Sequence, residues 1–249
     1  MEGDIHQLLG EWPYESGRLC VRRIKGQDGR KNLQLRIEMG ILQMEITGRP
    51  DGDRPHGYES LLHYYRAEAT ASEEREKGSF TLDSDACLEL QMEALQYYHR
   101  RITFLEIGEY EKGKRDAERN LQLFDFVKLY AAEEDDRMAM EQYRPFVIGH
   151  RVRAGVLQKL EDDEYDGALK EIEEGIDEVR EFLADVGRPD LIDESEEIAF
   201  LKDWADEIRK DRPKTLSQNL KEQLKEAVDT EDFEKAAELR DRLRTISGN

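Results

Sequence analysis

The stretch KTLSQNLKEQLKEAVDTEDFEKAAELRDRLRTISGN, residues 214–249, spaces its apolar side chains three or four apart on both sides of a polar break at Asp229–Asp232. This spacing marks one face of an α-helix. Thr215, followed by Gln218 three positions later, predicts a capping box at the start of the first helix, and Thr230 is a candidate cap for the second. Two short helices joined by a tight turn form an antiparallel hairpin.

The core of this stretch, DFEKAAELRD over Asp232–Asp241, resembles the UVR motif. That motif is shared by the B and C subunits of the bacterial UvrABC excinuclease, some Clp-type ATPases and a protein-arginine-kinase activator. In these families the hairpin is an interaction module without catalytic groups, and pairing of two such hairpins is its best-known use. The resemblance therefore implies a protein partner, including one that itself carries a UVR-like hairpin.

We expect the partner-binding residues to lie on the apolar seam of the hairpin and at its rim. Charges at such a rim set partner choice more than affinity. Two helices this short are marginal in water, so the seam must pack against a partner or against the rest of the chain. A docking module and a structural cap are both open as hypotheses. The expected residues are Leu220, Leu224, Phe233, Ala236, Ala237 and Leu243 in the seam, of which Leu220, Leu224, Phe233, Ala237 and Leu243 face one another, with Arg240 and Asp241 at the rim.

Length and composition limit the class of protein. The chain has 249 residues, 38% hydrophobic and 39% charged, which suits one large or two ordinary domains with a modest core. Its apolar runs are too short to span a membrane, and its acidic first residues do not resemble a signal peptide. Cys20 and Cys87 lie far apart without a CxxC motif, which fits a reducing compartment. We expect a cytoplasmic bacterial protein that does not bind membranes.

The net charge of −20 is unevenly distributed. Lys and Arg outnumber Asp and Glu nine to six over residues 15–57, whereas residues 58–213 carry −19. An acidic surface of this kind disfavours nucleic acid and anionic lipid. The small positive excess near the N-terminus does not readily outweigh it, so we predict that this region does not bind DNA tightly.

Residues 1–57 predict an N-terminal helix and a small antiparallel β element. Arg18–Lys25 precedes a turn whose Asp28-Gly29 pair favours a hairpin. The following segment alternates apolar and polar residues, and the phase shifts by one at Gly40. Such a shift indicates either a bulge or a tight turn. We expect a sheet of two or three strands.

The loop GRPDGDRPHG, residues 48–57, is a possible anion-binding loop because it carries Arg49, Arg54 and His56. Arginines on a loop suit acidic or phosphorylated groups. The alternative is a plain connector with exposed arginines.

Residues 58–210 predict an acidic helical domain. A helix over Tyr58–Ala69 is followed by a polar linker over Thr70–Ser79, and the chain is helical from Asp83 almost to its end. Residues 211–249 form a linker and the UVR-like hairpin. The long helix after Asp83 carries a stripe expected to face the core: Leu88, Met92, Leu95, Tyr98, Ile102 and Leu105.

An internal repeat lies within this helical domain. Leu105–Phe124 aligns with Leu160–Val179, 55 residues later, through a shared Leu-Glu, a short acidic turn and a tyrosine. We predict that Tyr110 and Tyr165 occupy equivalent buried positions just after helix–helix turns. The pattern is similar in architecture to tetratricopeptide (TPR) hairpins but lacks their full consensus. The fold class expected is mainly α: an antiparallel TPR-like array, a small N-terminal β element and a C-terminal helical hairpin.

Motifs that carry chemistry are missing from the sequence. It has no phosphate-binding GxxxxGK[ST] loop, GxGxxG, HExxH or GxSxG, and its five histidines lack metal-ligand spacing. We predict no enzymatic activity, no cofactor and no metal. The expected function is a protein–protein interaction adaptor. The alternatives are an accessory factor of nucleotide excision repair or of a Clp-type protease system and, third, an enzyme or a direct nucleic-acid binder.

Overall fold

The computed structural model describes residues 4–74, 80–213, 216–230 and 232–247. The chain divides into two compact units, residues 1–203 and 204–249. The described residues are mainly helical, with a small antiparallel sheet near the N-terminus and a helical hairpin near the C-terminus, as predicted.

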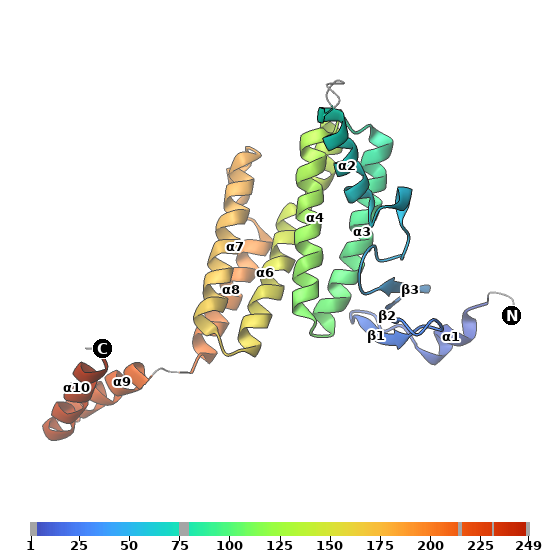
Figure 1. Cartoon of the computed structure of the whole chain (residues 1–249). Coiled ribbons are helices and arrows are strands. Elements are labelled where there is room, and N and C mark those ends of the chain that lie inside the picture. Colours follow the sequence, from blue (N-terminus) through green and yellow to red (C-terminus); the bar gives the residue numbers. More distant parts are fainter. Residues whose placement is uncertain (1–3, 75–79, 214–215, 231, 248–249) are drawn as a thin grey trace. The chain divides into compact units, whose positions relative to one another are not determined.

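The elements follow one another along the chain as shown in Figure 1. They are α1 (His6–Glu11), β1 (Cys20–Lys25), β2 (Lys31–Ile37), β3 (Gly40–Glu45), the single 3₁₀ turn η1 (Pro55–Gly57), α2 (Leu61–Glu74), α3 (Ser84–Glu106), α4 (Tyr110–Tyr130), α5 (Glu134–Glu141), α6 (Arg144–Glu161), α7 (Tyr165–Asp185), the 3₁₀ turn η2 (Pro189–Leu191), α8 (Glu196–Asp211), α9 (Leu216–Asp229) and α10 (Phe233–Ser247). The division between the two units falls within α8.

The sheet has the order β1-β2-β3, with antiparallel pairing throughout. Ile37 pairs with Gly40, so a two-residue turn at Glu38 and Met39 joins β2 to β3. The phase shift at Gly40 therefore marks a tight turn and not a bulge. Reversal of the chain restores one apolar face to both strands.

The central strand β2 is covered on both faces. Leu33 and Leu35 pack with Met44 and with Phe104 of α3, which attaches the sheet to the helices. The opposite face is polar and includes Arg36, whose Nε donates to the Trp12 carbonyl at 2.9 Å. Strand alternation thus sends apolar side chains to the helices and polar ones toward the N-terminal segment.

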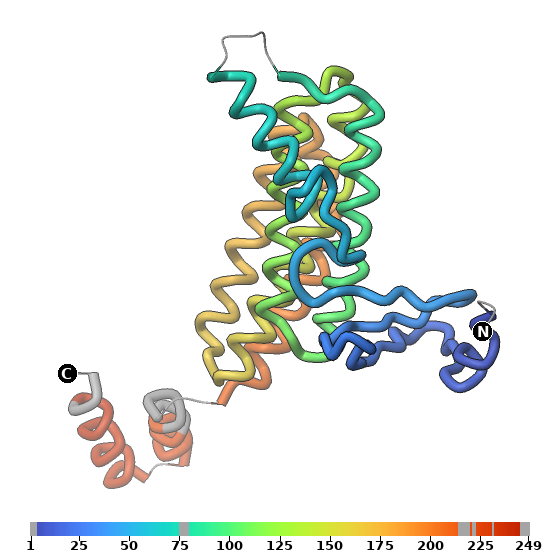
Figure 2. Tube along the Cα trace, turned by 45° about the vertical axis from the view of Figure 1, so that its right-hand side comes forward, coloured from blue at the N-terminus to red at the C-terminus, as the bar shows by residue number. Residues whose placement is uncertain are grey.

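Four long helices, α3, α4, α6 and α7, form an antiparallel array in which each packs against the next (Figures 1 and 2). The side chain of Asp83 caps α3 by accepting a hydrogen bond from the Ala86 N–H at 2.9 Å. Pro145 lies in the first turn of α6, where proline is well tolerated. A Cβ at Gly175 of α7 would collide with Val152 of α6, so glycine permits this close helix approach.

The turn before α4 recurs before α7, 55 residues later. Gly108 and Asp163 occupy equivalent places with φ of 76° and 59°. Tyr110 and Tyr165 are the first residues of α4 and α7, so their equivalence is confirmed, but both are half-buried and not fully buried. The wider likeness to tetratricopeptide repeats stays a prediction. The matching hydrogen bonds run from Glu109 N to the Phe104 carbonyl at 2.9 Å and from Glu164 N to the Lys159 carbonyl at 2.8 Å.

One prediction about the helices is wrong in part, and one short helix was not predicted. The linker expected over Thr70–Ser79 begins as helix, because α2 continues to Glu74, and residues 75–79 lie outside the described residues. Its polar composition reflects an exposed helix surface and not the end of the helix. The short helix α5 was not predicted separately.

The stripe expected to face the core along α3 lies partly on the outside. Leu88, Met92 and Leu95 are 57%, 55% and 44% exposed. The buried face of α3 is a parallel stripe that consists of Leu90, Ala94, Tyr97, Arg101 and Phe104, and it is completed by the buried Glu93 and Arg100.

Candidate interaction hairpin

The hairpin of α9 and α10 has a small apolar core of its own. Side chains from both helices meet there at helical spacing, and the alanines allow close approach. The fully buried members are Leu220, Ala227, Ala236 and Leu239, with Leu224 and Leu243 packed against them. Four of the predicted seam residues, Leu220, Leu224, Ala236 and Leu243, are thus placed at the helix–helix contact.

The turn between α9 and α10 is closed by hydrogen bonds, from Asp232 N to the Ala227 carbonyl at 2.8 Å among others. Asp232 caps α10 by accepting from Lys235 N at 3.1 Å. Thr230 was expected in this role, but its hydroxyl donates back to the Glu226 carbonyl of α9 at 2.8 Å. The predicted cap Thr215 lies outside the described residues.

Phe233 and Ala237 do not lie in the seam, which corrects the prediction. Phe233 is 69% exposed, and Ala237 is exposed as well. The buried stripe of α10 continues from Ala236 one turn back to the capping Asp232, so Phe233 falls beside that stripe. The helix starts with its aromatic ring outside the hairpin core.

The exposed face of α10 combines apolar surface with charge. Phe233, Ala237 and Arg240 follow one another at four- and three-residue spacing, so they share a face of the helix. Val228, near the end of α9, is 50% exposed. Arg240 contacts Asp241 at 3.4 Å, with both side chains mostly exposed. Because an exposed pair contributes only about 0–1 kcal/mol, Arg240 can exchange this contact for one with a partner at little cost.

The position of Phe233 has counterparts in the helical array. Phe233, Tyr110 and Tyr165 are each the first residue of a helix that follows a turn closed by a hydrogen bond between residues five apart. The two tyrosines are half-buried within the array, whereas the phenylalanine is mostly exposed. The hairpin therefore presents an aromatic side chain that its own unit leaves uncovered.

In the loop over residues 48–57, Arg49 is engaged in ion pairs within the chain and is not free to bind an anion. Arg49 is 13% exposed at its side chain and lies 3.1 Å from Asp51, 3.7 Å from Asp53 and 3.6 Å from Glu93. Its charge is thus matched within the chain. His56 stacks on Tyr64 with ring centroids 4.0 Å apart, and Arg54 is exposed. The geometry favours a structural connector over an anion-binding loop.

The buried charged residues inside the helical array were not predicted from the sequence. Glu93, fully buried, accepts hydrogen bonds from the N–H groups of Leu61 and Leu62 at 2.8 and 3.3 Å, and it also pairs with Arg119. The carboxylate therefore sits at the N-terminus of α2, where the helix dipole favours it. An acidic residue in a charged helix gives no local signal that it will be buried.

The described part of the chain shows no candidate metal site and no candidate membrane-spanning helix. Among residues 4–74, 80–213, 216–230 and 232–247, no three His, Cys, Asp or Glu side chains gather where they could hold a metal ion. Within the same ranges, no helix combines the length and the apolar character needed to cross a membrane.

Comparison with known proteins identifies the C-terminal hairpin alone. Residues 215–248 match the family model of the UvrB/uvrC motif. That match coincides with α9 and α10, so the motif and the observed hairpin are the same structure. No match to the chain was found among curated proteins or solved structures.

Proposed function

We propose that this chain is a non-enzymatic protein–protein interaction adaptor whose docking element is the α9–α10 hairpin. The observation that supports this most is the exposure of Phe233, 69%, on a hairpin that already has its own core. Phenylalanine and arginine are both enriched in the buried core of protein interfaces. An exposed phenylalanine on the same helix face as an arginine suits that role.

The partner proposed is a protein that carries a second UVR-like hairpin. Phe233 and Val228 would supply the apolar centre of the contact, and Arg240 would lie at its rim. The match to the UvrB/uvrC motif favours an excinuclease subunit as the bearer of that hairpin and keeps a role in excision repair as the finer alternative.

A binding experiment with defined probes tests this proposal. The full chain is titrated with labelled UVR hairpins from the excinuclease B and C subunits and with its own hairpin. We expect saturable binding to at least one probe, weakened by Arg240→Glu while helicity in circular dichroism stays unchanged. Lys225→Glu, an exposed charge reversal on α9, is the matched control and should leave binding intact.

Deleting residues 214–249 separates the docking module from a structural cap. The proposal predicts that the shortened chain loses probe binding and keeps its melting temperature. If no probe binds the full chain and the deletion lowers the melting temperature, the hairpin is a cap and the adaptor proposal is wrong.

A further inference from the structure

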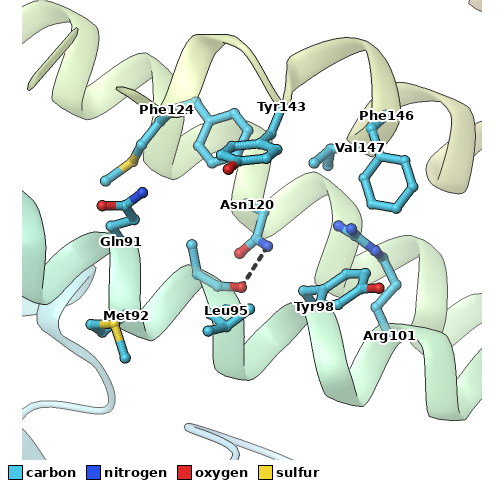
Figure 3. A pocket seen from close by; sticks show the side chains of 12 residues that line it. Gln91, Met92, Leu95, Tyr98, Arg101, Asn120, Phe124, Tyr143, Phe146 and Val147 are labelled. Atoms are coloured by element: carbon cyan, nitrogen blue, oxygen red, sulfur yellow. Dashed lines mark hydrogen bonds between the residues drawn. The ribbon is translucent and has the colours of Figure 1, made fainter. Parts of the chain in front are cut away.

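A cavity of about 510 Å³ lies within the helical array, between α3, α4 and the start of α6. This volume is in the usual range for sites that bind small molecules. Its walls are mainly apolar, and Figure 3 shows the rings of Tyr98, Phe124, Tyr143 and Phe146 around it. Leu95 and Tyr143 are about half-exposed, so the cavity opens to solvent beside them.

One positive charge lies in the wall of this apolar cavity. Arg101 is 1% exposed, and its guanidinium lies between the rings of Tyr98 and Phe146 (Figure 3). Its Nε donates to His150 Nδ1 at 3.1 Å. Its Nη1 is buried, and no group in the described part of the chain accepts a hydrogen bond from it. Buried donors are almost always paired, so this one calls for an explanation.

The neighbouring Arg100 is a buried arginine whose charge is paired within the fold. It is equally buried, but it donates to both carboxylate oxygens of Asp116. Within the described ranges, Arg101 forms no ion pair with a carboxylate. Of these two adjacent arginines on one helix, only Arg100 is paired with a carboxylate.

His150 does not supply that anion. Burial, and then the nearby Arg101 and Arg153, lower the pKa of His150 to about 3, so the ring is neutral at pH 7. Since Arg101 donates to Nδ1, the ring proton is on Nε2. Burial lowers the pKa of Arg101 to about 10, which leaves its guanidinium charged at neutral pH. The cavity wall thus holds one uncompensated positive charge.

We propose that this cavity binds a small organic acid with one carboxylate and an apolar body. The carboxylate would pair with the free end of the Arg101 guanidinium, whose two terminal nitrogens match a carboxylate in a forked contact. The body would lie against the aromatic rings and Leu95. A ligand with several negative charges fits less well, because the site offers a single cation in a chain of net charge −20.

The path from the mouth of the cavity to the Arg101 guanidinium also suits a ligand of this shape. The carboxylate must travel from the half-exposed Leu95 and Tyr143 to a guanidinium that is almost fully buried. Phe146, 39% exposed, lies beside the guanidinium and forms part of the way between it and solvent. An acid at the tip of an apolar chain meets both requirements. Met92, 55% exposed on α3, is a further apolar residue of the cavity lining.

Calorimetric titration of the full chain with octanoate and with octanol tests the proposal. These probes share an apolar chain and differ in the carboxylate. We expect the wild type to bind octanoate at least tenfold more tightly than octanol, since a hydrogen-bonded charge pair of this kind contributes about that factor. Arg101→Met should abolish the preference. Arg153→Met removes an exposed arginine from α6 outside the cavity and should retain it.

Circular dichroism would reveal a folding defect in Arg101→Met. A second variant tests the proposal independently of that substitution. Leu95→Asp places a carboxylate at the half-exposed mouth of the cavity and should weaken octanoate binding more than octanol binding. The proposal is overturned if the wild type does not prefer octanoate, if a folded Arg101→Met keeps the preference, or if Leu95→Asp leaves octanoate affinity unchanged.

Discussion

Arg100 donates two hydrogen bonds to Asp116, from Nε to Oδ2 at 2.7 Å and from Nη2 to Oδ1 at 3.0 Å, and both residues are 1% exposed. The same guanidinium donates from Nη1 to the carbonyls of Glu45 and Gly48 at 3.0 and 2.8 Å. Arg100 therefore joins α3, α4 and the end of the sheet at one point.

Asp116→Ala should destabilise the helical array strongly. It leaves the Arg100 charge buried without its carboxylate, which typically costs about 3–5 kcal/mol. Asp177→Ala, which breaks the exposed pair with Arg180, is the control and should cost about 0–1 kcal/mol. Urea unfolding followed by circular dichroism measures both. Equal effects of the two substitutions would show that the buried pair has no special role.

The repeated turn predicts that substitutions at Gly108 and Asp163 have opposite effects on stability, because both residues have a left-handed backbone conformation. Gly108→Ala should destabilise by about 1 kcal/mol, because a side chain is strained there. Asp163→Gly should be neutral or stabilising by up to about 1 kcal/mol, because it relieves the same strain. Thermal unfolding of the two variants tests the equivalence. Destabilisation by Asp163→Gly would argue that the aspartate has a separate structural role.

His150 gives the stability of the fold a defined dependence on pH. Its pKa, about 3 in the folded chain, lies below its ordinary value of 6.5 in an unfolded chain. Between these values the unfolded state binds more protons, so stability falls as pH falls through this window, by at most about 1.4 kcal/mol per pH unit. Above pH 6.5 the contribution is constant.

The variant His150→Gln removes this titration and keeps an acceptor for Arg101. Its free energy of unfolding should fall less steeply than that of the wild type between pH 6 and pH 4. The exposed His6 of α1 provides the control, since His6→Gln should reproduce the wild-type profile. Parallel profiles for the wild type and His150→Gln would exclude a buried neutral imidazole.

The fold was predictable from sequence where apolar periodicity was strong and the turn residues were distinctive. The strands around Gly40 and the C-terminal helical hairpin are both in place. These features depend on local physics, namely strand alternation and helical spacing. Local signals of this kind do not need knowledge of the rest of the fold.

The face of α3 could not be chosen from sequence alone. Its residues form two stripes at helical spacing, one with Leu88, Met92 and Leu95, the other with Leu90, Ala94 and Tyr97. The second stripe is buried, although it carries Arg101 and lies beside Arg100 and Glu93. The charges on this buried side of α3 are satisfied by groups from other helices and from the loop after β3, which the sequence of α3 does not reveal.

The candidate sites were predictable to different degrees. The motif located the docking hairpin, but the exposure of Phe233 depends on where α10 begins, and boundaries are the least certain part of a helix prediction. The cavity around Arg101 was not predicted at all. Its arginine has an unsatisfied Nη1 because of the way that α3, α4 and α6 pack, which no local pattern encodes.

Phe233→Ala tests the central claim most directly, because it separates docking from folding. Phe233 lies outside the hairpin core, whereas Leu239 belongs to it, so Leu239→Ala is the matched control for loss of structure. The measurement is the affinity of the full chain for a labelled UVR hairpin, together with helicity by circular dichroism. We expect Phe233→Ala to weaken binding at least tenfold with unchanged helicity. Unchanged affinity, or a loss of helicity as large as that of Leu239→Ala, would contradict the assignment of this face as the docking surface.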